Sequence, residues 1–273
     1  MGGTKGLFDG TPNGQGNARK HLVEGIKSTL KKMQLEYVDV IFSHRFEKFT
    51  PIEETVRAMN FIIDQGWAFY WATSEWPAYA VKEACDIADR LGLVRPIVEQ
   101  PEYNVFERNK VEHELVDLFT TRKLGLTVWS PLSGGVLTGK YIDAMPSDAR
   151  LADPGFRAWA IHFDEQVEKT RALRTIADRL GCTLAQLATA WCASNPNVST
   201  VLLGARTVAQ LEETVKAMGF VDQITREIKN EIDAVVQFVP KRTVPDAFYT
   251  IRERHVLGKT ERPAWADAFN KKD

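Results

Sequence analysis

The sequence predicts an α/β fold in which helices cover both faces of a parallel sheet. Short apolar runs alternate with amphipathic helix patterns, and strands in this order pair in parallel through right-handed crossovers. The apolar runs are continuous rather than alternating, which is typical of strands buried on both faces. The chain has 273 residues, a length typical of one (β/α)8 barrel, which needs about 250 residues.

The first half of the chain repeats a strand–helix pattern after a Gly-rich start. Residues 1–18 are expected to form a loop, with a weaker candidate strand at Thr4–Phe8. Helices are indicated by apolar spacings of three and four, and strands by β-branched and aromatic runs. The predicted order is helix 19–33, strand 37–42, helix 51–65, strand 67–72, helix 79–91, strand 96–100, helix 109–121 and strand 125–129.

End signals indicate several boundaries in the chain. Thr50 is expected to cap the helix that begins at Pro51, and Gly66 is expected to end it. Capping boxes at 183–186 and 207–210 open two later helices. The second half continues with a polar excursion at 143–164, helices 166–180 and 184–194, a buried strand 198–203, a helix from 207 and a last helix 224–238.

The number of strands differs from what the length suggests. Five strands are predicted, whereas a closed parallel barrel needs eight. An open Rossmann-type sheet is the alternative, but no G-x-G-x-x-G motif follows any predicted strand. We therefore expect an incomplete barrel domain at 1–240 and a charged C-terminal tail at 241–273.

Composition excludes several classes of protein. The 35 Lys and Arg residues balance 36 Asp and Glu residues, so no basic excess indicates a nucleic-acid partner. No apolar run approaches a membrane span, and the N-terminus lacks the apolar segment of a signal peptide. The three cysteines are odd in number and widely spaced, which argues against disulfides and zinc sites. These features predict a cytoplasmic protein without a metal.

Polar or glycine residues follow every predicted strand. The chemistry of parallel barrels lies at the carboxyl ends of the strands, so a shared rim of functional residues is favoured over five unrelated loop starts. His44 could polarise a carbonyl group or be a structural histidine inside the barrel. The rim residues are His44 and Arg45, Ser74 and Glu75, Gln100 with Glu102 and Tyr103, Trp129 and Ser130, and Gly204 and Arg206.

Two loops have features of phosphate sites. The segment 204–207 joins a strand to a capped helix, where free N-terminal amides and Arg206 suit a phosphate, although an ordinary βα turn has the same pattern. The Gly-rich segment 130–135, with Lys140 beyond it, could line a pyrophosphate with amides and an ammonium group. No pair of histidines or cysteines has metal-ligand spacing.

Six stretches covering about residues 18–240 carry a resemblance to a known family. They are similar to the voltage-gated potassium-channel β subunits, including their plant relatives, within the aldo-keto reductase superfamily. The stretches are ARKHLVEGIKSTLKKMQLEYVDVIFSHR, TPIEETVRAMNFIIDQGWAFYWATSEW, PIVEQPEYNVFERNKVE, VWSPLSGGVLTGKY, LGCTLAQLATAWCASNPNVSTVLLGA and AQLEETVKAM.

The resemblance implies a (β/α)8 TIM barrel of aldo-keto reductase type that lacks its first two to three strand units. It implies NADP as the cofactor and hydride transfer from NADPH to an aldehyde or ketone. It also implies a homotetramer and, as an alternative function, a regulatory subunit bound to the α subunit of a voltage-gated potassium channel with little or no catalysis.

The resemblance also assigns roles to individual residues. His44 falls at the substrate-side His or Asn position of the family, and Ser74 and Gln100 fall on residues that hold the nicotinamide carboxamide. Trp129 takes the position that stacks on the nicotinamide ring. The remaining assignments are Ser130, Leu132 and Lys140 for the pyrophosphate, and Arg150, Gly204, Arg206, Gln210 and Glu213 for the adenosine and its 2′-phosphate.

The family's acid–base residues are the main departure. The resemblance assigns no residue here to the catalytic Asp or to the Tyr that donates a proton, so we expect impaired carbonyl reduction and a chain truncated at its N-terminus. In one alignment Lys5 is the catalytic lysine, and in another it belongs to a loop. Glu75 stands where channel-type members often carry Arg, and Thr214 replaces the usual Asn near the adenine.

Overall fold

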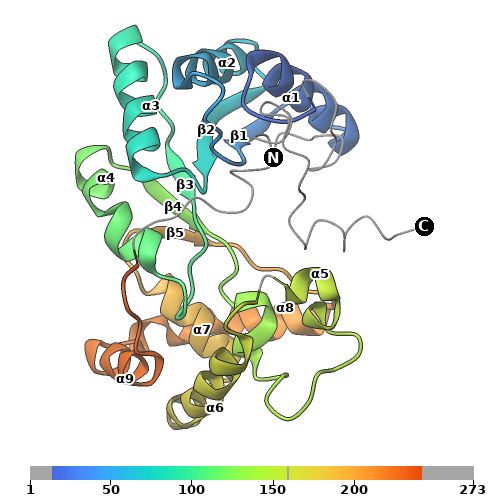
Figure 1. Cartoon of the computed structure of the whole chain (residues 1–273), viewed down its shortest axis with the longest axis vertical. Coiled ribbons are helices and arrows are strands. Elements are labelled where there is room, and N and C mark those ends of the chain that lie inside the picture. The colour runs from blue at the N-terminus through green and yellow to red at the C-terminus, as the bar shows by residue number, and fades with distance from the viewer. Residues whose placement is uncertain (1–13, 159, 242–273) are drawn as a thin grey trace. The chain divides into compact units, whose positions relative to one another are not determined.

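The computed structural model describes residues 14–158 and 160–241 (Figure 1). Its sheet follows chain order, β1-β2-β3-β4-β5, and the pairs from β1 to β4 are parallel. The described residues form two compact units. Unit 1 holds 14–101 and 111–126, and unit 2 holds 102–110 and 127–241. The parallel order confirms the predicted α/β fold.

Unit 1 consists of strand–helix repeats. Helices α1, α2 and α3 contact one another in sequence order, and α2 also packs on β2. In the register of β1 and β2, Val40 pairs with Tyr70 and Phe42 pairs with Ala72. The elements are α1 (Arg19–Met33), β1 (Val38–Ser43), α2 (Ile52–Asp64), β2 (Ala68–Ser74), α3 (Ala78–Leu91), β3 (Val98–Gln100), a π-helix (Lys110–Glu114), α4 (Val116–Thr121) and β4 (Gly125–Val128), whose last two residues belong to unit 2.

The core of unit 1 forms where the apolar face of α2 meets β2. Val56, Met59 and Ile62 recur at a spacing of three and are fully buried, as is Trp71 of β2. Burying side chains of this size stabilises a fold by about 1.5–3 kcal/mol each. The buried face of α2 therefore follows its helical periodicity.

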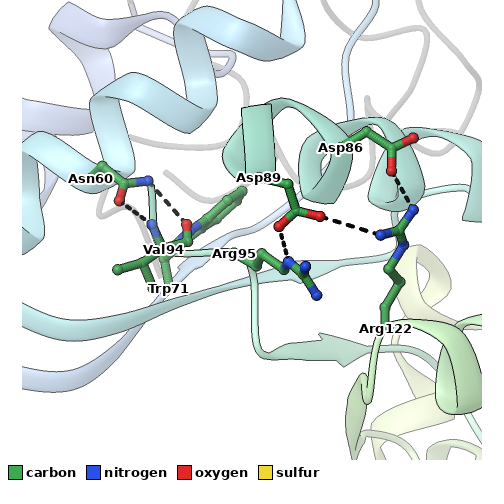
Figure 2. Close-up of polar contacts among 7 residues, drawn as sticks. All are labelled: Asn60, Trp71, Asp86, Asp89, Val94, Arg95 and Arg122. Atoms are coloured by element: carbon green, nitrogen blue, oxygen red, sulfur yellow. Dashed lines mark hydrogen bonds and ion pairs between the residues drawn. The ribbon is translucent and has the colours of Figure 1, made fainter. Parts of the chain in front are cut away.

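Polar contacts tie the helices of unit 1 to the segment before β3 (Figure 2). The Asn60 side chain accepts from Val94 N at 2.7 Å and donates to Val94 O at 3.1 Å, and Trp71 Nε1 donates to the same carbonyl at 2.7 Å. Arg122, at the end of α4, pairs with Asp86 and Asp89 of α3. Because Val94 has both backbone groups satisfied, the loop can lie against the buried Trp71.

Unit 2 is built around α7 (Leu184–Ala193), which is buried along nearly its whole length. Helix α7 contacts the neighbouring helices and β5, and Leu202 N donates to Val128 O of β4 at 2.8 Å. The other elements are 3-10 helices η2 (Ser133–Thr138), η3 (Arg150–Ala152) and η4 (Lys216–Gln223), helices α5 (Pro154–Arg157), α6 (Phe163–Leu180), α8 (Val208–Val215) and α9 (Arg226–Val236), and strand β5 (Val198–Val201).

A buried arginine joins the loop after β3 to α9 within unit 2. Arg108 pairs with Asp233 at 2.6 Å, and its guanidinium lies over the Trp191 ring at 4.6 Å. The Arg108 side chain is only 6% exposed, whereas that of Asp233 is 51% exposed. A buried charge needs such a partner, so the contact favours one position of α9.

Several local expectations are confirmed and others are wrong. Gly66 has φ +72°, as its role at the end of α2 requires, and Thr183 forms the full capping box of α7. Thr50 does not cap α2. The N-cap is Pro51, and the Glu47 carboxylate accepts the amides of the preceding turn. Strand β5 is shorter than predicted and partly exposed, because it has two exposed residues at its centre.

Other expectations concern termini, membranes and metals. The candidate strand Thr4–Phe8, Lys5 and the tail from 242 lie outside the described residues. Within residues 14–158 and 160–241, no helix is long and apolar enough to cross a membrane. The same part of the chain contains no cluster of three metal-binding side chains.

Candidate coenzyme site

The polar residues at the carboxyl ends of β1, β2 and β3 meet in unit 1. Ser74 and Gln100 are register partners, and Ser74 Oγ donates to the Gln100 carbonyl at 3.0 Å. Arg45 Nη1 donates to Ser74 Oγ at 3.1 Å and to His44 O at 2.8 Å. The structure thus brings together the three predicted site residues His44, Ser74 and Gln100, with Arg45 between two of them.

The turn after β2 is held in an unusual backbone conformation. Glu75 has φ +57°, in the left-handed region that costs a non-glycine residue about 1 kcal/mol or more. Its N–H donates to the Gln100 carbonyl at 3.3 Å. The same carbonyl therefore accepts from Ser74 and Glu75, which fixes the turn against the end of β3.

The environment of His44 keeps its imidazole neutral. Burial lowers the pKa of His44 to about 4, the Arg45 guanidinium acts in the same direction, and the Glu75 carboxylate opposes the shift. At neutral pH the ring has one N–H donor and one acceptor nitrogen. It can donate a hydrogen bond to a carbonyl oxygen, but it is not a reservoir of imidazolium acid.

The loop after β4 places predicted pyrophosphate residues in unit 2. Ser130 has φ +58°, and its carbonyl accepts from Asn104 Nδ2 at 3.1 Å. Leu132 is the N-cap of η2, and its carbonyl accepts from Gly135 N at 2.9 Å. Gly135 has φ +95°, and a Cβ there would lie 2.9 Å from Cε of Lys140. The positive φ favours glycine at this position, whereas the flexible end of the Lys140 side chain could move away from an added Cβ.

Arg150, Gly204 and Arg206, which are predicted to bind the adenosine end, all lie in unit 2. Arg206 pairs with Asp148 at 3.4 Å, and 65% of the Arg206 side chain is exposed. The guanidinium of Arg150 lies over the Phe156 ring at 4.3 Å. A Cβ on Gly204 would find nothing within 4 Å. A ligand can therefore approach this backbone closely.

Three further predicted residues, Gln210, Glu213 and Trp129, make structural contacts in unit 2. Gln210 Oε1 accepts from Arg206 N at 2.9 Å, so it holds the turn before α8. The Glu213 carboxylate accepts from the Thr183 hydroxyl, which caps α7. Trp129 pairs with Glu102 as a parallel bridge, and its carbonyl accepts from Tyr103 N at 3.1 Å. The predicted coenzyme roles of these residues stay predictions.

Sequence reasoning missed the residues that hold the site residues in place. Asn104 is buried and supports the loop at Ser130, and Glu99 is fully buried beside Gln100. Both belong to the run VEQPEYN, in which the rim residues Gln100, Glu102 and Tyr103 were recognised. The signal in the sequence was Glu99, a charged residue inside a short apolar strand.

Comparisons with known proteins identify the family. A protein of Arabidopsis thaliana named as a probable voltage-gated potassium channel subunit beta is 54% identical over 234 residues, 85% of this chain and 71% of the relative. An Oryza sativa subsp. japonica protein of the same name is 52% identical over 235 residues, 85% of this chain and 72% of the relative. A Schizosaccharomyces pombe protein, also named for such a subunit, is 43% identical over 234 residues, 84% of this chain and 68% of the relative.

Residues 1–237 match the sequence profile of the aldo/keto reductase family. The chain belongs to this family. Aldo/keto reductases typically bind a nicotinamide coenzyme, and the described residues fit such a group. The space beside Gly204 is open, and Lys140, Arg150 and Arg206 are exposed basic side chains of the kind that phosphates require.

Proposed function

We propose that this protein binds NADP(H) and that its reaction is hydride transfer from NADPH to a small aldehyde or ketone. The observation that carries the proposal is the hydrogen-bonded pair Ser74–Gln100 beside the neutral His44. Membership of the aldo/keto reductase family supports the same reaction class. The coenzyme, when bound, supplies the hydride.

The nicotinamide end is assigned to Ser74, Gln100 and Trp129. A serine hydroxyl and a glutamine amide together offer a donor and an acceptor, which is what a carboxamide group requires. The Trp129 indole offers a flat apolar face for an aromatic ring. The Ser74 hydroxyl already donates to a backbone carbonyl and accepts one hydrogen bond from Arg45, so it has one further lone pair that could accept from the carboxamide N–H.

The phosphate groups are assigned to unit 2. Ser130, Leu132 and Lys140 are proposed to bind the pyrophosphate, and Arg206 with Arg150 the 2′-phosphate. Arginine suits a phosphate dianion because its planar fork forms two parallel hydrogen bonds. Arg206 must exchange Asp148 for the phosphate, and this exchange costs little because both side chains are exposed. Gly204, Gln210 and Glu213 are proposed to surround the adenosine.

His44 is proposed to hydrogen-bond the carbonyl oxygen of the substrate. A neutral imidazole can orient and polarise that oxygen, but it is a weak acid. The resemblance assigns no residue of this chain to the family's Asp or Tyr, and Lys5 is the remaining candidate for the family's lysine. General acid catalysis is commonly worth about 10²–10⁴-fold in rate, so we expect slow carbonyl reduction by this chain.

Coenzyme titration tests the proposal directly. Quenching of tryptophan fluorescence is expected to report saturable NADPH binding that is tighter than NADH binding. Steady-state NADPH oxidation with a reactive aldehyde is then expected to be weak. Failure to bind either nucleotide contradicts the proposed function, and rapid turnover contradicts the expectation that a proton donor is lacking.

A second candidate function is a regulatory β subunit of a voltage-gated potassium channel with little catalysis. The names of relatives that are 54% and 52% identical favour it. A cytoplasmic homotetramer bound to a channel α subunit is then expected. Co-purification with a channel cytoplasmic domain and light scattering of the purified protein test both points, and a monomer that binds no channel domain contradicts them.

A further inference from the structure

The proposed function makes no use of the buried carboxylate of Glu99. This residue lies in β3 and is 0% exposed. A buried carboxylate is unfavourable unless donors replace its lost water. The Thr73 hydroxyl donates to Oε2 of Glu99, and the backbone N–H of Trp76 donates to Oε1 at 3.1 Å. Because both donors come from β2 and the turn after it, the carboxylate connects β3 to that turn.

The two donors stand on either side of the left-handed turn. Thr73 precedes Ser74, and Trp76 follows Glu75, whose φ of +57° needs support from its surroundings. The carboxylate of Glu99 therefore holds the turn at both ends. A change in either contact releases the residue pair between them.

Strand geometry places this contact directly behind two proposed coenzyme residues. Thr73 is the register partner of Glu99, and Ser74 is the register partner of Gln100. Successive side chains of a strand point to opposite faces. The Thr73–Glu99 pair thus lies on one face of the sheet, and the Ser74 and Gln100 side chains lie on the other.

We propose that Glu99 is a positioning residue for the nicotinamide end of the coenzyme. The inference rests on the proposed function, because it concerns the same Ser74–Gln100 pair. Glu99 acts through the turn. Its carboxylate fixes Ser74 against the carbonyl of Gln100, so that the Ser74 hydroxyl and the Gln100 amide face a carboxamide together. The binding of the adenosine end, assigned to unit 2, does not depend on Glu99.

The substitution Glu99→Gln tests this assignment. The amide nitrogen of glutamine cannot accept a hydrogen bond, so one of the two donors, Thr73 or Trp76, loses its acceptor. The Kd for NADP⁺ is expected to rise about 10-fold, the effect of losing one buried hydrogen bond. The Kd for adenosine 2′,5′-bisphosphate, which lacks the nicotinamide half, is expected to stay within twofold. The ratio of the two constants is the readout.

Two further variants keep the test decisive. Thr73→Val removes one donor without changing the side-chain shape much, and the same rise in the ratio is expected if Glu99→Gln fails to fold. Glu47→Gln is the matched control, because Glu47 is also a buried carboxylate of unit 1 that accepts backbone amides. Its ratio is expected to equal that of the wild type.

The outcomes separate the two proposals. An unchanged ratio in Glu99→Gln or, if that variant fails to fold, in Thr73→Val overturns the positioning role while leaving coenzyme binding intact. An equal change in Glu47→Gln overturns it too, because the effect would then be one of general stability. If the wild-type chain binds neither nucleotide, the proposed function fails, and this assignment fails with it.

Discussion

Unit 1 and unit 2 hold their proposed coenzyme residues in different ways. In unit 1, Ser74 is buried and hydrogen-bonded to a backbone carbonyl of the next strand. In unit 2, Arg206 is exposed and pairs with an exposed aspartate. Neutral buried contacts are insensitive to salt, whereas exposed charges are screened and mobile. The comparison suggests a preformed nicotinamide end and an adaptable phosphate end.

Removing the exposed charge is the strongest test of this contrast. Arg206→Leu is expected to weaken NADPH binding by about 10–100-fold, because a charge-assisted hydrogen bond is worth about 1.5–3 kcal/mol. NADH lacks the 2′-phosphate, and its Kd is expected to change less than twofold. Fluorescence titration with both coenzymes measures the difference.

The control for Arg206 is another exposed arginine of unit 2. Arg179 pairs with Glu231 at 2.5 Å, and its side chain is 53% exposed. Arg179→Leu is expected to leave both Kd values unchanged. Equal losses for NADPH and NADH in Arg206→Leu would contradict the 2′-phosphate assignment.

The support of unit 1 can be broken far from the site. Asn60→Ala removes both contacts to Val94 and leaves the Val94 N–H without its acceptor (Figure 2). The free energy of unfolding is expected to fall by about 1–3 kcal/mol. Hydrogen exchange resolved by residue is expected to show faster exchange in unit 1 and little change in unit 2.

The outcome depends on whether the two units unfold separately. Equal acceleration in both units would show that they unfold together and would contradict a difference in how the two units hold their residues. Thr121→Ala, which removes an exposed hydroxyl of α4, is a suitable control and is expected to leave exchange unchanged.

The pH dependence of stability is a smaller test of unit 1. The pKa of His44 is lowered to about 4 in the fold, below the ordinary value of about 6.5. Between pH 6.5 and pH 4, His44 binds a proton more readily in the unfolded chain than in the fold. The free energy of unfolding is therefore highest above pH 6.5 and falls as the pH is lowered towards 4. From pH 7 to pH 5 the loss is expected to be about 1–2 kcal/mol.

The substitution His44→Asn isolates this contribution. The difference between wild type and variant in urea unfolding is expected to shrink on acidification, because asparagine does not titrate. A difference that stays constant from pH 7 to pH 5 would contradict the assignment of a neutral, partly buried His44.

Surface ion pairs of unit 1 are expected to give the smallest effect. Arg122 pairs with Asp86 and Asp89, whose side chains are 42% and 35% exposed. Pairs of this kind contribute up to about 1 kcal/mol. Asp86→Asn is expected to lower stability by less than Asn60→Ala and to leave coenzyme affinity unchanged. A larger loss than that of Asn60→Ala would reverse this ranking of buried and exposed contacts.

Much of the fold followed from local patterns, and the failures had local causes. The end signals at 50–53 and at Gly66 predicted helix α2, and Gly66 ended it as expected. The cap at Thr50 was wrong: Pro51 is the N-cap and no side chain caps α2, while the Glu47 carboxylate accepts the Thr50 amide. Strand β5 was read as buried from its apolar residues, but two of its four residues are exposed.

The sequence by itself determined the order of strands and helices and the polar residues at the strand ends, because periodicity and end signals are local. Only the tertiary structure decided which polar groups meet. Glu99 contacts Thr73, and Asn104 contacts Ser130, each across 26 residues of chain. Contacts of this kind depend on the register between neighbouring strands and on the course of the turns, which the pattern along one strand does not specify.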